Sequence, residues 1–291
     1  MHKGAISVYL RKQDMQKQGI RPWLREQLAK GRLHITRAEL RSAFPKHTDN
    51  AIKSALQRAE QDCLIAHAWQ GFYLLLPPAY AKRKTLPPFL YIDDLMRYLQ
   101  KPYCVALLNA AETYGAAHQK PMKFAVMTTN PPPRSRQTHG TKLEFLAKRE
   151  FNKGIPEPFI KKVKVQTGYV SISSPEITAL SLVQYYRAAG GMQHVLTVLE
   201  ELVEACHFDN LPVATLNYFP VSCLQRLGFM LDEILAQHMQ ATHLMQHIQQ
   251  HSSRRLQYVP LIPKDNAGAT DRNSKWKIII NAQLHTDFDD T

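Results

Sequence analysis

Residues 46–58 carry side chains of the types that bind nucleic acid, and most of them share the spacing of one helix face. Basic side chains bind phosphate oxygens, whereas amide and guanidinium groups can also bind base edges. A solvated surface charge is an equally good interpretation of any one of them alone, so the prediction rests on the whole stripe. We predict that double-stranded DNA is bound by Lys46, Thr48, Asn50, Lys53, Ser54, Gln57 and Arg58.

A helix over residues 49–62 must position this stripe. Apolar residues recur on its other face at the spacing of a buried helix stripe (Ala51, Ile52, Ala55, Leu56 and Ala59). A shorter helix is predicted just before it, because Thr36 and Glu39 have the spacing of a capping box and Pro45 ends the segment. Two helices joined by a tight turn, with a polar basic face on the second, are typical of a helix-turn-helix.

A short hairpin follows the second helix. Residues 64–68 and 72–76 have strand composition, and a turn at residues 69–71 separates them. A hairpin in this position is a wing, whose tip we expect near the DNA backbone. With a further helix over residues 22–29, residues 1–80 are predicted to form a winged helix-turn-helix domain.

The charge is concentrated in the same part of the chain. The 291 residues carry a net charge of +13, and the first 90 hold 16 of the 37 Lys and Arg but 6 of the 24 Asp and Glu. A merely solubilising surface would not need this concentration, whereas a phosphate backbone favours it. Arg11, Lys12 and Lys17, with Arg21 and Arg25, either flank the DNA-binding surface or are ordinary surface residues.

Residues 77–90 are proline-rich and charged, and are predicted to form an extended linker. Beyond it, residues 91–291 mix the two periodicities, so we predict an α+β domain. Helices are expected over 91–99, 103–114, 175–189, 191–206 and 220–251. Strands are expected over 123–129, 142–146, 161–166, 169–172, 258–262 and 276–281.

No catalytic site is predicted in this second domain. The sequence contains no P-loop, GxGxxG, GxSxG or HExxH motif. Glu144 and Lys148 lack the spacing of a nuclease motif. His243, His247 and His251 can share a helix face, but a solvated polar face is the preferred interpretation over a metal site. We therefore expect no catalytic residue, metal or cofactor.

A second small basic cluster consists of Arg134, Arg136 and Lys142, which can contact nucleic acid or an acidic protein. The four cysteines show no paired spacing, so reduced thiols are expected. No apolar run approaches the length of about 18 residues that spans a membrane, and the first ten residues lack a signal-peptide pattern. A cytoplasmic protein with no membrane partner is the expectation.

The order of features resembles the AbiEi family, the antitoxins of AbiE abortive-infection toxin–antitoxin systems. A winged helix precedes a series of segments in a characteristic order: 103–115 (YCVALLNAAETYG), Thr128-Thr129, 170–186 (VSISSPEITALSLVQYY), Gly190-Gly191, 224–229 (LQRLGF) and 273–281 (NSKWKIIIN). The resemblance covers most of the chain. Its most specific parts are the Ser-Pro-Glu helix, the Gln-Arg-Leu-Gly segment and the Trp/Asn ending.

The resemblance implies two roles. The winged helix would repress its own operon by binding inverted repeats in the promoter, and the C-terminal domain would counteract a cognate nucleotidyltransferase-type toxin without a stable complex. It implies no catalytic residue. Two alternatives stay open: a ligand-sensing winged-helix repressor unrelated to toxins, and a nuclease.

Overall fold

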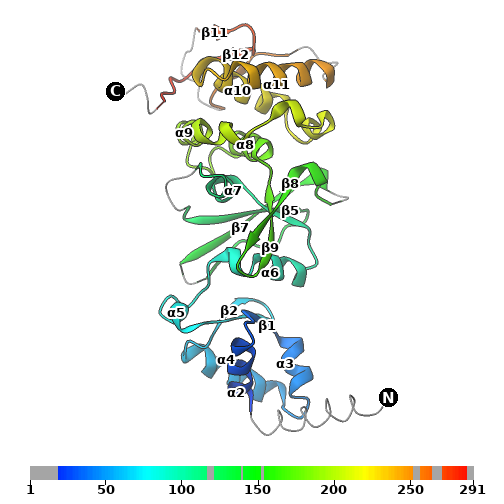
Figure 1. Cartoon of the computed structure of the whole chain (residues 1–291), viewed down its shortest axis with the longest axis vertical. Helices are drawn as coiled ribbons and strands as arrows, with labels where there is room; N and C mark the ends of the chain where they lie inside the picture. Colours follow the sequence, from blue (N-terminus) through cyan, green and yellow to red (C-terminus); the bar gives the residue numbers. More distant parts are fainter. Residues whose placement is uncertain are drawn as a thin grey trace. The chain divides into compact units, whose positions relative to one another are not determined.

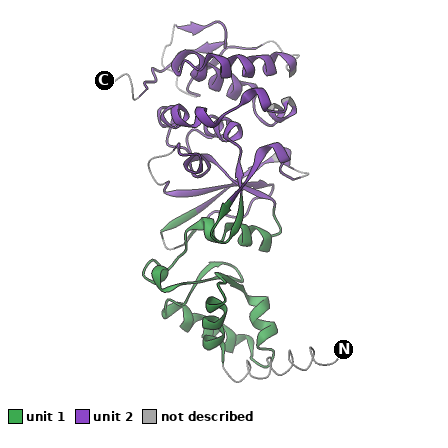
Figure 2. Ribbon diagram, viewed as in Figure 1, with its two compact units in different colours: residues 1–101, 136–142, 164–170 green, residues 102–135, 143–163, 171–291 purple. Residues whose placement is uncertain are grey.

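The computed structural model describes residues 19–116, 121–138, 140–151, 154–251, 256–263 and 271–286. The chain forms two compact units, coloured separately in Figure 2. Unit 1 comprises residues 1–101, 136–142 and 164–170, and unit 2 comprises residues 102–135, 143–163 and 171–291. Helices and sheets occur in both units, which confirms the predicted α+β class. The predicted basic residues Arg11, Lys12 and Lys17 lie outside the described part of the chain.

Unit 1 begins with three helices and a three-stranded sheet. Their order is α2 (Ile20–Ala29), β1 (His34–Thr36), α3 (Arg37–Ala43), α4 (Asp49–Gln61), β2 (Ile65–Trp69) and β3 (Phe72–Leu75). The strands are hydrogen-bonded in the order β1-β3-β2, and both neighbours of β3 run antiparallel to it. Leu24, Ile35, Leu40 and Ile52 are completely buried between the helices and the sheet.

The proline-rich segment is less extended than its composition predicts. It contains a short helix, α5 (Pro78–Ala81), and a 3₁₀ turn, η1 (Pro88–Leu90), which lead into α6 (Ile92–Tyr98). Prolines occupy the first turns of both short elements, where a missing N–H costs no hydrogen bond. Helix α6 is part of unit 1, because Tyr98 packs on Phe72 and donates a hydrogen bond to the carbonyl oxygen of Gln70.

A larger sheet follows, with strands in the order β6-β7-β5-β4-β9-β8. Its strands are β4 (Tyr103–Val105), β5 (Lys123–Thr129), β6 (Arg136–Thr138), β7 (Thr141–Lys148), β8 (Ile160–Val165) and β9 (Gly168–Ser173). Strand β4 pairs antiparallel with β5 and parallel with β9. The prediction of one helix over residues 103–114 is wrong, because β4 precedes the helix α7 (Leu107–Thr113).

Helices and 3₁₀ turns make up most of the rest of unit 2 (Figure 1). The turns are η2 (Arg149–Phe151), η3 (Glu157–Phe159), η4 (Val203–Ala205), η5 (Phe208–Asn210) and η6 (Val213–Tyr218). The helices are α8 (Pro175–Gln184), α9 (Met192–Leu202), α10 (Val221–Phe229) and α11 (His238–His251). A π-helical turn, η7 (Met230–Ile234), separates α10 from α11, so the helical pattern predicted over residues 220–251 is interrupted.

The last described segment packs on α10. Strands β10 (Val259–Pro260), β11 (Arg272–Asn273) and β12 (Ile278–Ile279) form a small sheet in the order β10-β12-β11. Trp276 is completely buried, and its ring occupies the space that a side chain at Gly228 would need. Among the described residues, no helix is long and apolar enough to cross a membrane.

Candidate nucleic-acid interface

Helix α4 separates its residues into two faces. Ile52, Leu56 and Ala59 are buried in the core of unit 1. The helical members of the predicted DNA-binding set are all exposed: Asn50, Lys53, Ser54, Gln57 and Arg58. Lys46 and Thr48, in the preceding turn, are exposed as well. The structure therefore brings the seven predicted residues together on one turn and one helix face.

Two arginines of α3 hold the beginning of α4. Arg37 and Arg41 contact the carboxylate of Asp49 at 3.0 and 2.7 Å. Arg41 also donates to the carbonyl oxygen of His47 at 2.9 Å. The acidic group nearest the predicted interface is thus paired with two cations. The sequence analysis did not include these arginines, although their separation by four residues on one short helix places them on a common face.

Thr48 is the N-cap of α4. Its side-chain oxygen accepts a hydrogen bond from the backbone N–H of Ala51 at 3.2 Å. A capping hydroxyl satisfies one of the helix's first unpaired N–H groups and fixes the direction in which the chain enters the helix. This contact gives Thr48 a structural role in addition to the DNA contact predicted for it.

Several polar groups of the α4 face have no partner within the described residues. The side chains of Lys46, Asn50, Lys53 and Gln57 make no hydrogen bond or ion pair there. Arg58 Nε donates to the carbonyl oxygen of Ser54 at 3.3 Å, which leaves its terminal nitrogens available. The face therefore presents amide and cationic donors to solvent.

Hydrogen bonds from two other segments restrain the turn of the β2–β3 hairpin. The hydroxyl of Tyr98 donates to the carbonyl oxygen of Gln70 at 3.0 Å. The backbone N–H of Arg37 donates to the carbonyl oxygen of Gly71 at 2.8 Å. Gly71 has a φ of +75°, and a Cβ there would lie 2.6 Å from the Tyr98 hydroxyl oxygen. A glycine is needed at this position for both reasons.

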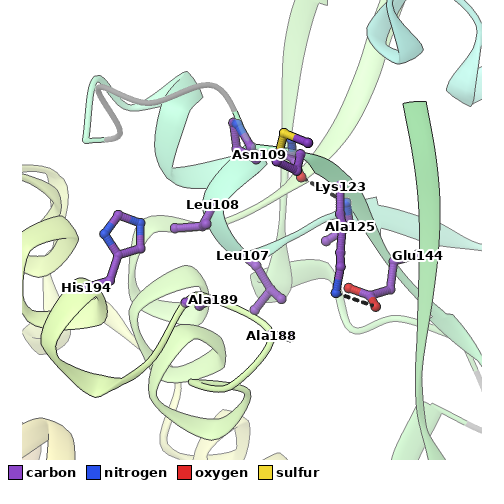
Figure 3. A pocket seen from close by; sticks show the side chains of 12 residues that line it. Leu107, Leu108, Asn109, Lys123, Ala125, Glu144, Ala188, Ala189 and His194 are labelled. Atoms are coloured by element: carbon purple, nitrogen blue, oxygen red, sulfur yellow. Dashed lines mark hydrogen bonds and ion pairs between the residues drawn. The ribbon is translucent and has the colours of Figure 1, made fainter. Parts of the chain in front are cut away.

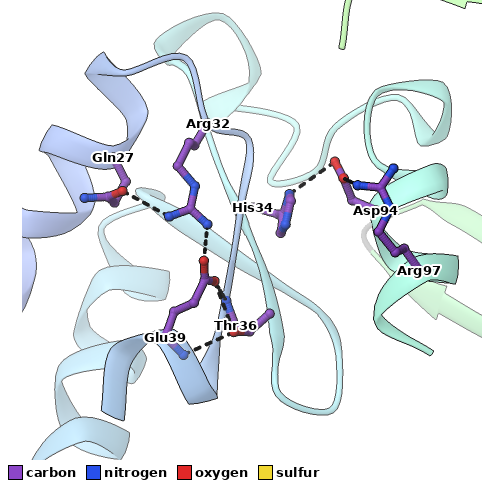
Figure 4. A network of polar contacts seen from close by, with 7 residues as sticks. All are labelled: Gln27, Arg32, His34, Thr36, Glu39, Asp94 and Arg97. Atoms are coloured by element: carbon purple, nitrogen blue, oxygen red, sulfur yellow. Dashed lines mark hydrogen bonds and ion pairs between the residues drawn. The ribbon is translucent and has the colours of Figure 1, made fainter. Parts of the chain in front are cut away.

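The predicted capping box opens α3 and belongs to a larger polar network (Figure 4). The Thr36 hydroxyl oxygen accepts a hydrogen bond from the backbone N–H of Glu39, and the Glu39 carboxylate accepts one from the backbone N–H of Thr36. Arg32 binds the other Glu39 oxygen and also Gln27. Burial alone would raise the pKa of Glu39, but the bonds from Thr36 and Arg32 outweigh it and lower that pKa.

His34 contacts the Asp94 carboxylate at 3.2 Å, on the far side of β1 from this network (Figure 4). Its ring also stacks on Phe72, with the ring centroids 5.0 Å apart. The contact with Asp94 therefore attaches β1 to α6 within unit 1.

The three residues of the second basic cluster have different surroundings. Arg136 belongs to unit 1, and its Nη2 donates to Nδ1 of His67 on β2 at 3.2 Å. Burial and the positive charge of Arg136 lower the pKa of His67, which favours its neutral imidazole. Arg134 is exposed in the preceding loop of unit 2, and Lys142 is half-buried in β7. No local pattern indicates the contact with His67, because 69 positions separate the two residues.

The residues considered for a nuclease motif have separate partners. Glu144 binds Lys123 at 3.3 Å. Lys148 is 3% exposed, and its amine donates to the Gln184 side chain at 2.7 Å and to the Tyr218 carbonyl oxygen at 2.9 Å. Burial lowers the pKa of Lys148 to about 8.

The interpretation of His243, His247 and His251 as a solvated polar face is wrong for two of them. His243 and His247 are half-buried, and the Nδ1 atoms of both are shielded from solvent. Nε2 of His247 lies 2.7 Å from the carbonyl oxygen of Phe208, which places this ring against η5. The side chain of His251 lies outside what the structure describes. Among the described residues, no group of three His, Cys, Asp or Glu is arranged to hold a metal ion.

Comparison with known proteins gives a matching family model and solved structures of similar fold. No curated protein matches the sequence. The crystal structure of the RV2827C protein from Mycobacterium tuberculosis resembles this chain with a TM-score of 0.62 and 12% sequence identity, over 88% of each chain. At this identity the likeness shows a shared fold. The model of the AbiEi antitoxin C-terminal domain matches residues 103–233. This match over residues 103–233 agrees with the resemblance to the AbiEi family seen in the sequence.

Proposed function

We propose that this antitoxin is also a DNA-binding protein that represses its own operon through a winged helix-turn-helix formed by α2–α4 and β1–β3. The observation that carries the proposal is the exposed face of α4: it presents amide and cationic side chains, and Asp49 at its start is paired with Arg37 and Arg41. A helix of this kind fits the major groove of B-DNA.

The proposed division of labour follows from side-chain chemistry. Lys46 and Lys53 are point charges that suit phosphate oxygens, whereas Asn50, Gln57 and Arg58 can make the paired hydrogen bonds that distinguish bases. Thr48 and Ser54 add hydroxyls at the edge of the face. The restrained hairpin turn would hold a fixed position beside the duplex, so we assign it a role in orientation rather than in reading bases.

Inverted repeats in the promoter are the proposed target, because two copies of one unit related by a twofold axis read two half-sites of opposite orientation. Two monomers and a preformed dimer serve equally well. The AbiEi domain supports the second half of the proposal, in which the chain counteracts a nucleotidyltransferase-type toxin in the cytoplasm during phage defence without a stable complex.

A gel-shift assay against the promoter upstream of the chain's own gene, at several salt concentrations, tests DNA binding. The double variant K53A/R58A should bind more weakly, and its affinity should fall less steeply with salt, by about one unit of slope for each phosphate contact removed. The matched control is K161A/K164A, which removes the same charge from exposed positions of β8.

Two results would contradict the assignment. Equal binding of random DNA by the unaltered protein would remove the repressor role. Equal weakening in K161A/K164A would mean that overall charge, and not the α4 face, accounts for binding.

Co-expression of the full chain with the neighbouring gene tests the antitoxin role. The unaltered chain should relieve growth arrest by the toxin, and K53A/R58A should relieve it equally when both are expressed from a foreign promoter. Failure of the unaltered chain to relieve arrest refutes this half of the proposal and leaves the DNA-binding half standing.

A further inference from the structure

Unit 2 contains a cavity of about 330 Å³ that neither proposed activity uses. It lies between the first turn of α7, strand β5 and the segment that joins α8 to α9 (Figure 3). Leu107, Leu108, Ala125, Ala188 and Ala189 line much of it. The volume falls at the small end of the range of about 300–1,000 Å³ that is typical of small-molecule sites.

Polar groups stand at two sides of this apolar space. On one side Lys123 Nζ lies 3.3 Å from Glu144 Oε1, and both side chains remain partly exposed. On the other side the ring of His194 faces the cavity (Figure 3). The His194 ring makes no hydrogen bond with any residue that the structure describes. Convergent polar groups in an apolar cavity are the usual features of a binding site.

The walls are fixed by the fold. Asn109, which is 5% exposed, accepts a hydrogen bond from the backbone N–H of Ala125 at 2.8 Å and so joins α7 to β5. Gly190 has a φ of +91°, and a Cβ there would lie 3.0 Å from the His194 ring. A glycine at this position therefore gives the ring its room beside the cavity.

Two further features are concentrated at this place. Leu107 has a φ of +54°, a left-handed conformation that is unfavourable for a branched side chain and occurs preferentially at functional sites. Met122 also lines the cavity and is 86% exposed, which makes it the most exposed large apolar residue in the described chain. A bound molecule would cover apolar surface of this kind.

The polar groups restrict the chemistry of that molecule. The Lys123 ammonium donates hydrogen bonds and the neighbouring Glu144 carboxylate accepts them. An acidic ligand would face the carboxylate, and a basic ligand would face the ammonium. A neutral group that offers one acceptor beside one donor satisfies both charges without leaving either unpaired.

We propose that this cavity binds a neutral heterocycle with a lactam edge, of the class of guanine or uracil and their nucleosides. The ring carbonyl would accept from Lys123, the adjacent ring N–H would donate to Glu144, and the apolar walls would cover the ring faces. His194 would contact the opposite end of the molecule. The site requires neither DNA nor toxin, so its test is independent of the proposed function.

Titration calorimetry of the full-length protein with guanosine and uridine provides the test. At least one of them should give saturable heat. The matched controls are 1-methylguanosine, which lacks the ring N–H, and adenosine, which lacks the lactam edge. Each should bind at least about tenfold more weakly than guanosine, because a site group is then left unpaired.

Two variants place the binding in this cavity. A188L fills the space with a larger side chain from a half-buried position and should abolish the heat. E144Q adds little volume, removes the charge of the acceptor, and should weaken binding at least about tenfold. The exposed K161A substitution should have no effect. Thermal melting of each variant shows that it is folded, and E144Q alone decides the matter where A188L does not fold.

Three results overturn the proposal. One is the absence of heat with both nucleosides. Another is equal affinity for guanosine, 1-methylguanosine and adenosine, which would mean that the lactam edge is not recognised. The third is unchanged binding in E144Q, which would place the ligand elsewhere.

Discussion

Helices α4 and α8 begin in the same way and end up in opposite environments. Each is capped by a side-chain hydroxyl, from Thr48 in α4 and from Ser174 in α8. In α4 the polar face is exposed, whereas residues 175–183 of α8 are all buried. A cap therefore locates a helix without saying what the helix does, and the distribution of polar residues around it supplies that information.

The polar residues of unit 2 that carried the family resemblance work inside the protein. Glu176 of the Ser-Pro-Glu helix accepts from the backbone N–H of His207 at 2.9 Å. In the Gln-Arg-Leu-Gly segment, Gln225 donates to the carbonyl oxygen of Trp276 and Arg226 to that of Pro260, both at 2.9 Å. Asn281 binds both backbone groups of Ile262. Gln225 and Arg226 thus attach the last described segment to α10, Asn281 holds that segment together, and Glu176 joins α8 to His207, while the predicted DNA-binding residues of unit 1 face solvent.

The contrast between buried motifs in unit 2 and exposed residues in unit 1 is best tested by disturbing a buried motif. The largest effect is expected from the G228A variant. A Cβ at this position would lie 1.9 Å from the Trp276 ring, which is completely buried. We expect a loss of unfolding free energy of about 3 kcal/mol or more, since neither helix nor ring has space to move. Urea unfolding followed by tryptophan fluorescence measures it.

The half-buried Ser222, on the same helix, supplies the control. S222A should cost less than about 1 kcal/mol. A G228A protein as stable as S222A would show that the Trp276 segment does not depend on this close contact.

A smaller effect is expected from the acidic residue of the same region. Asp232 is 6% exposed and receives hydrogen bonds from Lys275 at 2.6 Å, Trp276 at 2.9 Å and His238 at 3.0 Å. Burial alone would raise the pKa of Asp232, but these bonds outweigh it and lower the pKa to about 2.

Because the pKa is lower in the folded protein, the charged carboxylate stabilises unit 2 above pH 3.8, its ordinary value, and loses that contribution as the pH falls toward 2. The contribution is about 2 kcal/mol. Unfolding experiments between pH 5 and pH 2 should show this decline in the unaltered chain and a shallower one in D232N. An equally steep decline of stability with pH in D232N and in the unaltered chain would contradict the role assigned to Asp232.

The smallest effect comes from the exposed cap of α4, and comparing it with the buried cap of α8 compares the two helices directly. T48A removes an exposed cap and should cost about 1 kcal/mol. S174A removes a cap that is 3% exposed and leaves a buried N–H without its partner, so it should cost about 2 kcal/mol. Hydrogen exchange over α4 and over α8 measures the two losses separately, and a larger loss in T48A would reverse the comparison.

The sequence predicted α3 and α4 well because their signals are local. Thr36, Glu39 and Pro45 act on neighbouring residues, and the buried stripe of α4 repeats within thirteen residues. Strand β4 was missed because the apolar spacing of residues 105–111 fits a helix. What makes residues 103–105 a strand is the pairing with β5 and β9, whose partners lie more than 20 and 60 positions away.

The residues of the candidate site differ in the same respect: some follow from local signals and others from contacts between distant segments. The α4 face follows from periodicity, whereas the contacts of Arg136 with His67 and of Tyr98 with Gln70 join segments that are 69 and 28 positions apart. The environment of His247 depends on η5, and the Nδ1 atom of His243 is also shielded from solvent, so composition alone suggested a solvated surface for both. The cavity in unit 2 is assembled from four separate stretches and leaves no motif in the sequence.

The membership of unit 1 has a practical consequence for protein engineering. Its residues come from three stretches of the chain, 1–101, 136–142 and 164–170. A chimera designed to change the proposed DNA specificity should therefore exchange side chains on α4 and leave the backbone intact. A transplant joined within the proline-rich segment would separate Gln70 from Tyr98 and His34 from Asp94. Substitution of surface side chains keeps both contacts, so a chimera made in that way should be as stable as its parent.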